Sequence, residues 1–122
     1  MNRLDRILLH LSDFRRVPVD PADVYYLDAA GDETLVRTRS SRLLRDVRSL
    51  GELFPAFKPF GFVRAHRNHA VNLRRIREIR RRKRSEDWEL KLQPPVNRVL
   101  PVSRGQLSKL LAAFGETRRR SR

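Results

Sequence analysis

The amino-acid sequence predicts a mostly β domain with two short helices, preceded by a short amphipathic N-terminal helix. Short β-branched and aromatic runs, separated by turn residues, fill most of the chain from Val17 to Pro101. Two capping-box patterns, Ser49–Glu52 and Ser103–Gln106, each begin an apolar stretch with helical spacing. At 122 residues, the chain is long enough for one domain with a modest core.

The first sixteen residues are expected to form the N-terminal helix or a linker. Four apolar residues have the i, i+3, i+4, i+7 spacing of one helical face, and prolines end the pattern: Leu4, Ile7, Leu8 and Leu11. Such a helix could cap the domain, pair with a copy of itself or continue a linker from upstream, and the sequence leaves these alternatives open. The predicted domain follows at residues 17–115, and residues 116–122 are expected to be a basic disordered tail.

The first part of the domain is predicted to be a hairpin, a third strand and a helix. Val24–Leu27 and Thr34–Arg39 form the hairpin around a loop whose glycine tolerates a positive φ. Arg42–Val47 is the third strand. The capping box at Ser49–Glu52 begins a short helix, and Pro59 ends it.

In the second part, Trp88–Leu92 and Arg98–Val102 are predicted to pair around a turn at Pro94–Asn97. The final helix begins after Ser103 and ends before Gly115, with four apolar residues on one face: Leu107, Leu110, Leu111 and Phe114. The segment 72–84 allows two structures from its residues alone. Apolar residues three apart suggest a helix with an arginine face, whereas β-branched isoleucines between strands allow an extended segment with one irregularity.

The charge of the chain favours a polyanionic partner. Lysine and arginine number 28 against 14 acidic residues, a formal net charge of +14, and arginine contacts to phosphate release counterions. The chain has no cysteine, which excludes disulfides and thiolate chemistry. No apolar run approaches the roughly 20 residues of a membrane span, and the N-terminus does not resemble a secretion signal. We therefore expect a soluble cytoplasmic protein without cofactor or small-molecule substrate.

The histidines and the arginine run each permit more than one function. His66 and His69 could bind metal, but a structural zinc site needs four ligands and only His10 remains. Catalysis by a histidine base needs a nucleophile and an orienting carboxylate, and neither stands near in sequence. A nuclease is nevertheless kept as an alternative. The eight basic residues from Arg74 to Arg84 are either a solvated face or a stripe that follows phosphates.

Two sequence motifs together resemble a known family. Residues 62–73 read FVRAHRNHAVNL, and Ile76, Ile79, a predicted hairpin and the sequence Leu-Pro-Val-Ser-Arg104 follow. Upstream, VPV precedes VYYLDA, and Ser49 begins the short helix. From about residue 17 to residue 114, this arrangement resembles the LytTR (LytR/AlgR-type) DNA-binding domain, the output module of many bacterial response regulators. The chain departs from the family pattern at Asn68-His69, where Ser-Tyr is common.

The resemblance implies short strands in small stacked antiparallel sheets, two brief helices, and an extended segment at residues 72–84. It also implies that loops enter successive major grooves, with base contacts from Arg67, Arg104 and the region of Glu33. The implied DNA backbone contacts, with structural roles as the alternative for His66 and Asn72, are Arg64, His66, Asn68, Asn72, Ser103, Lys109, Arg80 and Arg81. His69 is expected to pack against the sheet.

The sequence therefore predicts a non-enzymatic, sequence-specific binder of double-stranded DNA that acts as a bacterial transcriptional regulator. It would stand alone or serve as the output domain of a response regulator. Direct-repeat sites and a homodimer on DNA are expected, with the face of Leu4–Leu11 as a candidate contact between copies. The alternative is a basic RNA- or ribosome-binding protein, although RNA modules usually expose aromatic rings for base stacking.

Overall fold

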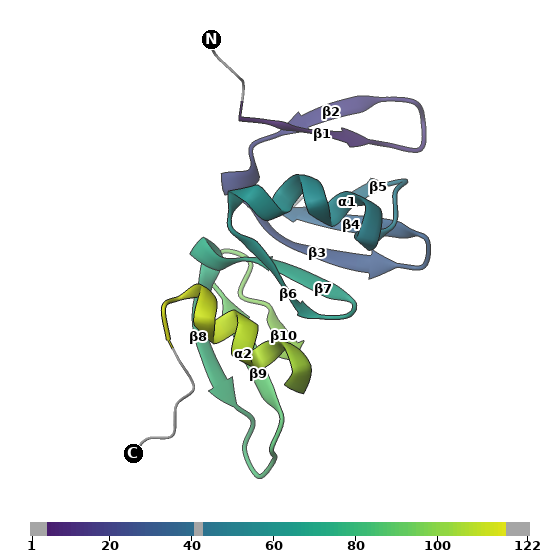
Figure 1. Ribbon diagram of the computed structural model, residues 1–122. Coiled ribbons are helices and arrows are strands. Elements are labelled where there is room, and N and C mark those ends of the chain that lie inside the picture. Colours follow the sequence, from purple (N-terminus) through teal and green to yellow (C-terminus); the bar gives the residue numbers. More distant parts are fainter. Residues whose placement is uncertain (1–4, 41–42, 117–122) are drawn as a thin grey trace.

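The computed structural model describes residues 5–40 and 43–116, which form three small antiparallel sheets and two helices (Figure 1). The two-stranded sheet contains β1 (Ile7–His10) and β2 (Arg16–Val19). The five-stranded sheet has the order β5-β4-β3-β7-β6, with β3 (Val24–Ala30), β4 (Glu33–Thr38), β5 (Leu43–Asp46), β6 (Phe62–His66) and β7 (His69–Asn72). The three-stranded sheet has the order β10-β9-β8, with β8 (Ile76–Arg81), β9 (Trp88–Leu92) and β10 (Val99–Val102). The helices are α1 (Leu50–Phe57) and α2 (Arg104–Ala113), so the mostly β prediction is confirmed.

The predicted N-terminal helix is wrong over the described residues. Ile7–His10 is a strand that pairs with β2 in the register Ile7↔Val19. This pairing joins residues on both sides of the predicted limit between the N-terminal segment, residues 1–16, and the domain. Ile7, Leu9 and Leu11 are buried while Leu8 is 48% exposed, which is the period-2 alternation of a strand. The helix prediction failed because pairing with β2 satisfies backbone groups that a short isolated helix would hold only marginally. Leu4 lies outside the described residues.

The predicted hairpins are confirmed. β3 and β4 pair up to Ala30↔Glu33, and Gly31 in the turn has φ +64°. β5 occupies the described part of the predicted third strand, and β9 pairs with β10. Each of these elements was visible in the sequence because its apolar pattern and its turn residues point to the same structure.

The five-stranded sheet lies between two apolar cores. On one side, its Leu27 and Val36 pack with α1 and β1. On the other side, its Tyr25 and Val71 pack with the three-stranded sheet and α2. Figure 1 shows this order, with β1–β2 and α1 at one end and the three-stranded sheet and α2 at the other. The central sheet thus carries both halves of the molecule.

The two helices begin where the sequence predicted, but their caps differ. The hydroxyl of Ser49 accepts from the Glu52 backbone N–H at 3.2 Å, and the Glu52 carboxylate accepts from the Ser49 N–H at 2.8 Å, so this capping box is complete. The side chain of Ser103 makes no such bond at the start of α2. Leu107 and Leu110 are buried as expected, whereas Phe114 is 52% exposed because it lies at the C-cap rather than on the buried face.

The segment 72–84 is extended rather than helical. A short 3-10 turn, Leu73–Arg75, leads into β8, and the pairing of β8 with β9 has an irregularity between Ile76 and Glu78. Leu73, Ile76 and Ile79 pack against the second core. Of the arginines between them, Arg77 is exposed on β8, whereas Arg74 and Arg75 lie in the 3-10 turn.

Candidate nucleic-acid interface

The turn between β6 and β7 presents Arg67 and Asn68 to solvent. The backbone N–H of Asn68 donates to Nδ1 of His66 at 3.1 Å, and its carbonyl accepts from the N–H of Ala29 at 2.8 Å. The guanidinium of Arg64 donates to the Arg67 carbonyl at 2.6 Å and lies 5.8 Å from the centre of the Phe54 ring. Three hydrogen bonds with β3 and β6 therefore hold the backbone of this turn.

The histidines next to this turn belong to a polar cluster with Asp28. Nδ1 of His69 lies 2.9 Å from Oδ1 of Asp28, although the oxygen is off the line of an ideal N–H···O bond. Oδ2 of Asp28 lies 3.5 Å from Nη1 of Arg98, and the same Nη1 donates to the Tyr26 hydroxyl at 2.7 Å. The rings of His66 and His69 are 5.2 Å apart. Tyr26, Asp28, His69 and Arg98 are called the Asp28 cluster below.

Burial favours the neutral form of His69. Its side chain is 12% exposed, and this burial lowers the pKa of His69, an effect that the Asp28 carboxylate offsets only in part. His69 packs against the sheet, as expected from the sequence. Within the described residues, no group of three or more potential metal ligands gathers around it or elsewhere.

The start of α2 lies against the strand that precedes the Arg67 turn. The backbone N–H of Ser103 donates to the carbonyl of Ala65 in β6 at 2.9 Å. The next residue, Arg104, has a side chain that is 77% exposed, and its Nη2 lies 3.5 Å from Oδ1 of Asp87. The two sequence motifs, far apart along the chain, are thus joined by one backbone hydrogen bond.

Glu33 and Lys109 are also near the surface. Glu33 follows the β3–β4 turn, and its carboxylate accepts from Arg45 at 3.1 Å. Lys109 is exposed on α2. The β3–β4 turn and the β6–β7 turn point to the same side of the molecule in Figure 1. The predicted base-contact region at Glu33 therefore carries a paired carboxylate.

The arginines of the β8–β9 hairpin are largely paired with carboxylates of the same hairpin. Arg80 forms ion pairs with Glu78 and, at 2.7 Å, with Glu89, which lies directly across the two strands. These bonds raise the pKa of Arg80. Arg81 lies 3.8 Å from Glu86, and Arg82 lies 3.7 Å from Glu89. At Arg80, Arg81 and Arg82, basic and acidic side chains therefore lie next to one another.

Asn72 does not have an exposed amide. It is 1% exposed, its side-chain nitrogen donates to the carbonyls of Pro21 and Val24, and its oxygen accepts from the Arg74 N–H at 3.0 Å. Of the two roles expected for it, the geometry supports the structural one. The predicted phosphate contact from Asn72 is corrected accordingly, because all of these bonds lie inside the fold.

Sequence reasoning missed three charged partners of the site. Asp28 lies in the quoted VYYLDA stretch but no role was expected for it, and nothing in the local sequence of Asp87 or Arg98 marks them as partners. Glu89 could have been found, because Glu89 and Lys91 alternate in a predicted strand beside a basic segment, which is typical of cross-strand ion pairs.

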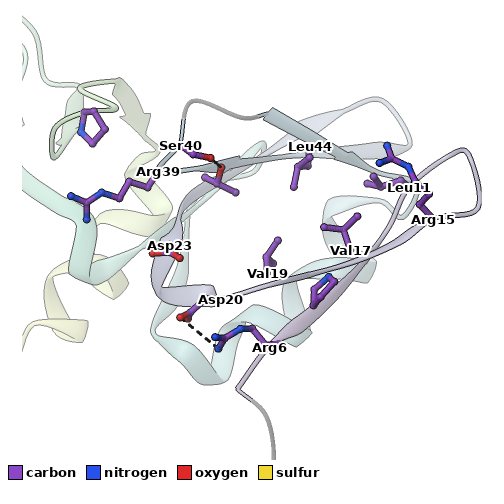
Figure 2. A pocket seen from close by; sticks show the side chains of 13 residues that line it. Arg6, Leu11, Arg15, Val17, Val19, Asp20, Asp23, Arg39, Ser40 and Leu44 are labelled. Carbon is purple, nitrogen blue, oxygen red and sulfur yellow. Dashed lines mark hydrogen bonds and ion pairs between the residues drawn. The ribbon is translucent and has the colours of Figure 1, made fainter.

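One cleft lies away from these residues. It has a volume of about 790 Å³ and lies at the end of the β3–β4 hairpin opposite its turn, between Asp23, Arg39 and the β1–β2 sheet. Figure 2 shows Arg6 and Asp20, which lie 3.6 Å apart, on its wall. None of the residues predicted to contact DNA lines it. Protruding turns, rather than this cleft, carry the candidate site.

A small β scaffold that presents arginines on turns and at a helix start has the architecture of a nucleic-acid-binding domain. The LytTr DNA-binding domain family model matches residues 15–115, and the chain belongs to this family. It is thus a DNA-binding domain of a kind that serves transcription regulation, and the family is not an enzyme family. In the part of the chain that the structure describes, neither helix is long and apolar enough to cross a membrane.

The fold also matches a solved structure. That structure is the LytTr DNA-binding domain of a Bacillus cereus protein described as a methyl-accepting/DNA response regulator. The match has a TM-score of 0.73 at 24% sequence identity and covers 93% of this chain and 100% of the other. The small stacked sheets implied by the sequence resemblance are thereby confirmed. A comparison with curated protein sequences gives no match.

Proposed function

We propose that this domain recognises a specific double-stranded DNA sequence by inserting its turns into successive major grooves. Arg67 and Arg104 read base edges, where an arginine fork suits the two acceptors of guanine. The observation that carries the proposal is the hydrogen bond from Ser103 to Ala65, because it joins the segments that present the two arginines. Reading two grooves requires such a constant separation.

The remaining polar residues of the site, exposed or half-buried, would hold the DNA backbone. Arg64, His66 and Asn68 surround the β6–β7 turn, Ser103 and Lys109 lie on the α2 side, and Arg80 and Arg81 lie on the β8–β9 hairpin. Contacts of this kind position a protein on the duplex and carry no sequence information. Glu33 is the third base contact, through acceptance from a cytosine amino group, and Arg45 holds its carboxylate in place.

In the cell, the domain would act in the bacterial cytoplasm as a transcriptional regulator, alone or as the output domain of a response regulator. Two copies would bind direct repeats. A repeat spacing near one helical turn, about 10–10.5 base pairs, or a multiple of it, places both copies on the same side of the DNA.

Selection from random duplexes tests the proposal. The chain is incubated with a pool of random-sequence DNA at physiological salt, and bound fragments are sequenced over several rounds. We expect enrichment of one motif that recurs in the same orientation. The double variant Arg67→Ala/Arg104→Ala serves as the control and should not enrich this motif. Equal binding of all duplexes, together with displacement by single-stranded RNA, would contradict the proposal and support a basic RNA-binding protein.

A further inference from the structure

The Asp28 cluster is built from three segments that meet beneath the Arg67 turn. In the five-stranded sheet, Asp28 of β3 is the direct cross-strand partner of His69 in β7, and His69 is in turn the partner of His66 in β6. Arg98 approaches from the segment before β10, on the side of the three-stranded sheet. The cluster therefore connects the strands of the Arg67 turn to the other half of the molecule.

Tyr26, Asp28 and His69 are largely enclosed, whereas the side chain of Arg98 is 43% exposed. The side chains of His69 and Asp28 are 12% and 18% exposed, and Nδ1 of His69 is buried without a well-aligned hydrogen bond. The guanidinium of Arg98 lies 4.9 Å from the centre of the Tyr26 ring while it bonds the hydroxyl of the same residue. The His69–Asp28 contact is largely shielded from water, and polar contacts are stronger there than in water. The contacts of Asp28 with His69 and Arg98 are thus suited to fixing its position.

The cluster lies close to the backbone that presents Arg67. His69 is the first residue after the turn, and Ala29, the residue after Asp28, donates its N–H to the carbonyl of Asn68. A shift of Asp28 relative to His69 would therefore move both anchors of the turn. A bidentate arginine–guanine contact depends on the direction of the guanidinium plane, so a small rotation of the turn weakens it.

We propose that Asp28 and His69 are positioning residues for the base contact of Arg67, and that Arg98 holds Asp28 in place from the other half of the molecule. The inference rests on the proposed DNA-reading function. It gives a role to His69, the position at which this chain departs from the family pattern. Residue 69 determines how strictly Arg67 discriminates its base pair, without touching DNA itself.

Two substitutions at residue 69 separate positioning from packing. His69→Phe keeps an aromatic ring of similar size but removes Nδ1, so the contact with Asp28 is lost. His69→Asn is smaller, yet its amide nitrogen can occupy the place of Nδ1 and restore the contact. A packing role predicts that the phenylalanine variant is the better of the two, whereas a positioning role predicts the reverse.

The measurement is the dissociation constant for the selected DNA site and for each of its single-base-pair substitutions, by fluorescence anisotropy with the full chain. Arg67→Ala and Arg104→Ala first identify the base pair that each arginine reads. His69→Phe should then reduce discrimination at the Arg67 base pair roughly threefold to tenfold, because part of a bidentate contact is lost. Discrimination at the Arg104 base pair should stay within about twofold, and His69→Asn should restore the wild-type profile.

A uniform loss of discrimination at all base pairs, or a profile that His69→Phe leaves unchanged, would overturn the inference. If His69→Phe does not fold, Asp28→Asn replaces it, since a carboxamide cannot attract both His69 and Arg98, and the same selective loss is expected. A different result would contradict the proposed function: the wild-type chain would show no preference among duplexes. The positioning role would then fail as well. A preference that Arg67→Ala removes and His69→Phe spares contradicts the positioning role alone.

Discussion

The β6–β7 turn and the β8–β9 hairpin both present arginine, but they differ in what neutralises it. Among the described residues, no carboxylate pairs with Arg67, and the turn is held through its backbone. In the hairpin, Arg80, Arg81 and Arg82 each lie within ion-pair distance of a glutamate. The turn therefore presents one arginine without a carboxylate partner among the described residues, whereas the hairpin presents several arginines whose charge is partly compensated.

This difference separates two ways of binding DNA. Exposed ion pairs such as Arg81–Glu86 contribute little to stability, and a phosphate can replace the glutamate. The hairpin is therefore suited to attraction that depends on salt and ignores sequence. The turn has less charge but a defined direction, as base reading requires. The longest basic run in the sequence is thus not the best candidate for specificity.

The largest expected effect is the loss of stability on substitution of Asn72, the buried last residue of β7. Asn72→Ala removes the partners of two carbonyls and one N–H inside the fold and should lower the free energy of unfolding by about 2–4 kcal/mol. Urea denaturation measures this change. Asn68→Ala is the matched control, because the hydrogen bonds of Asn68 are made by its backbone, and it should stay within about 0.5 kcal/mol of wild type. Equal stability of the two variants would refute the structural role of Asn72.

Removal of a reading arginine should affect DNA binding and spare the fold. Arg104→Ala should cost about 1–3 kcal/mol on the selected site and relax discrimination at one base pair, because a bidentate contact is lost. Arg67→Ala should do the same at a different base pair. Binding titrations against single-base-pair variants of the site measure both. A loss of affinity that is equal on all duplexes would instead show that these arginines act as phosphate contacts, as proposed for the arginines of the hairpin.

The hairpin arginines should behave in the opposite manner. Arg81→Ala should weaken binding to all duplexes alike and reduce the slope of log K against log salt by about one, the value for one lost phosphate contact. Arg81→Lys retains the charge and should retain the slope. Arg80→Ala should act in the same direction but less strongly, because Glu78 and Glu89 already compensate Arg80. A change in sequence preference in either variant would contradict the proposal that the turn reads bases and the hairpin contacts only phosphates.

Substitution of Glu89 tests the comparison in the opposite direction, by removing a negative charge from the hairpin. The Glu89 carboxylate accepts from Arg80 and lies near Arg82, so Glu89→Gln removes a negative charge that compensates both arginines and should tighten binding to every duplex, roughly twofold to fivefold at low salt. Asp5→Asn makes the same change in net charge beside β1, away from the hairpin, and serves as the control. If both variants tighten binding equally, net charge alone governs the attraction.

The smallest expected effect is a dependence of stability on pH. Burial lowers the pKa of His69 in the folded chain below the ordinary value, so the unfolded chain takes up the proton more readily. The free energy of unfolding should be fully maintained above about pH 6.5, the ordinary histidine pKa, and should fall as the pH decreases from there toward the folded pKa.

Substitution identifies the source of this slope. His69→Asn should reduce it, and the remainder should come from His10, whose pKa is lowered by desolvation and by Arg48. Urea unfolding at several pH values between 5 and 8 measures the slope. An unchanged slope in His69→Asn would contradict the assignment. A separate loss is expected at lower pH from Asp46: burial opposes its ionisation, but hydrogen bonds from Arg48 and from the His10 N–H hold the pKa of this carboxyl below its ordinary value.

Much of the fold could be predicted because its local signals agree with its final contacts. The capping box at Ser49–Glu52 forms as predicted because all its atoms lie within one turn of chain. The N-terminal prediction failed because Ile7 and Leu11 fit both a helical and an alternating pattern, and only the pairing with β2 distinguishes the two. The capping pattern at Ser103 failed in part, since its hydroxyl makes no cap bond.

The sequence alone determined the basic character of the chain, the hairpins β3–β4 and β9–β10, the starts of both helices, and the two motifs that carry Arg67 and Arg104. These properties depend on residue types and short spacings, which the chain retains in any conformation. Only the tertiary structure decided that Asn72 is buried, that glutamates compensate Arg80, Arg81 and Arg82, and that Asp28 and Arg98 meet His69 beneath the turn. Such facts depend on which distant segments become neighbours, and no local spacing encodes that choice.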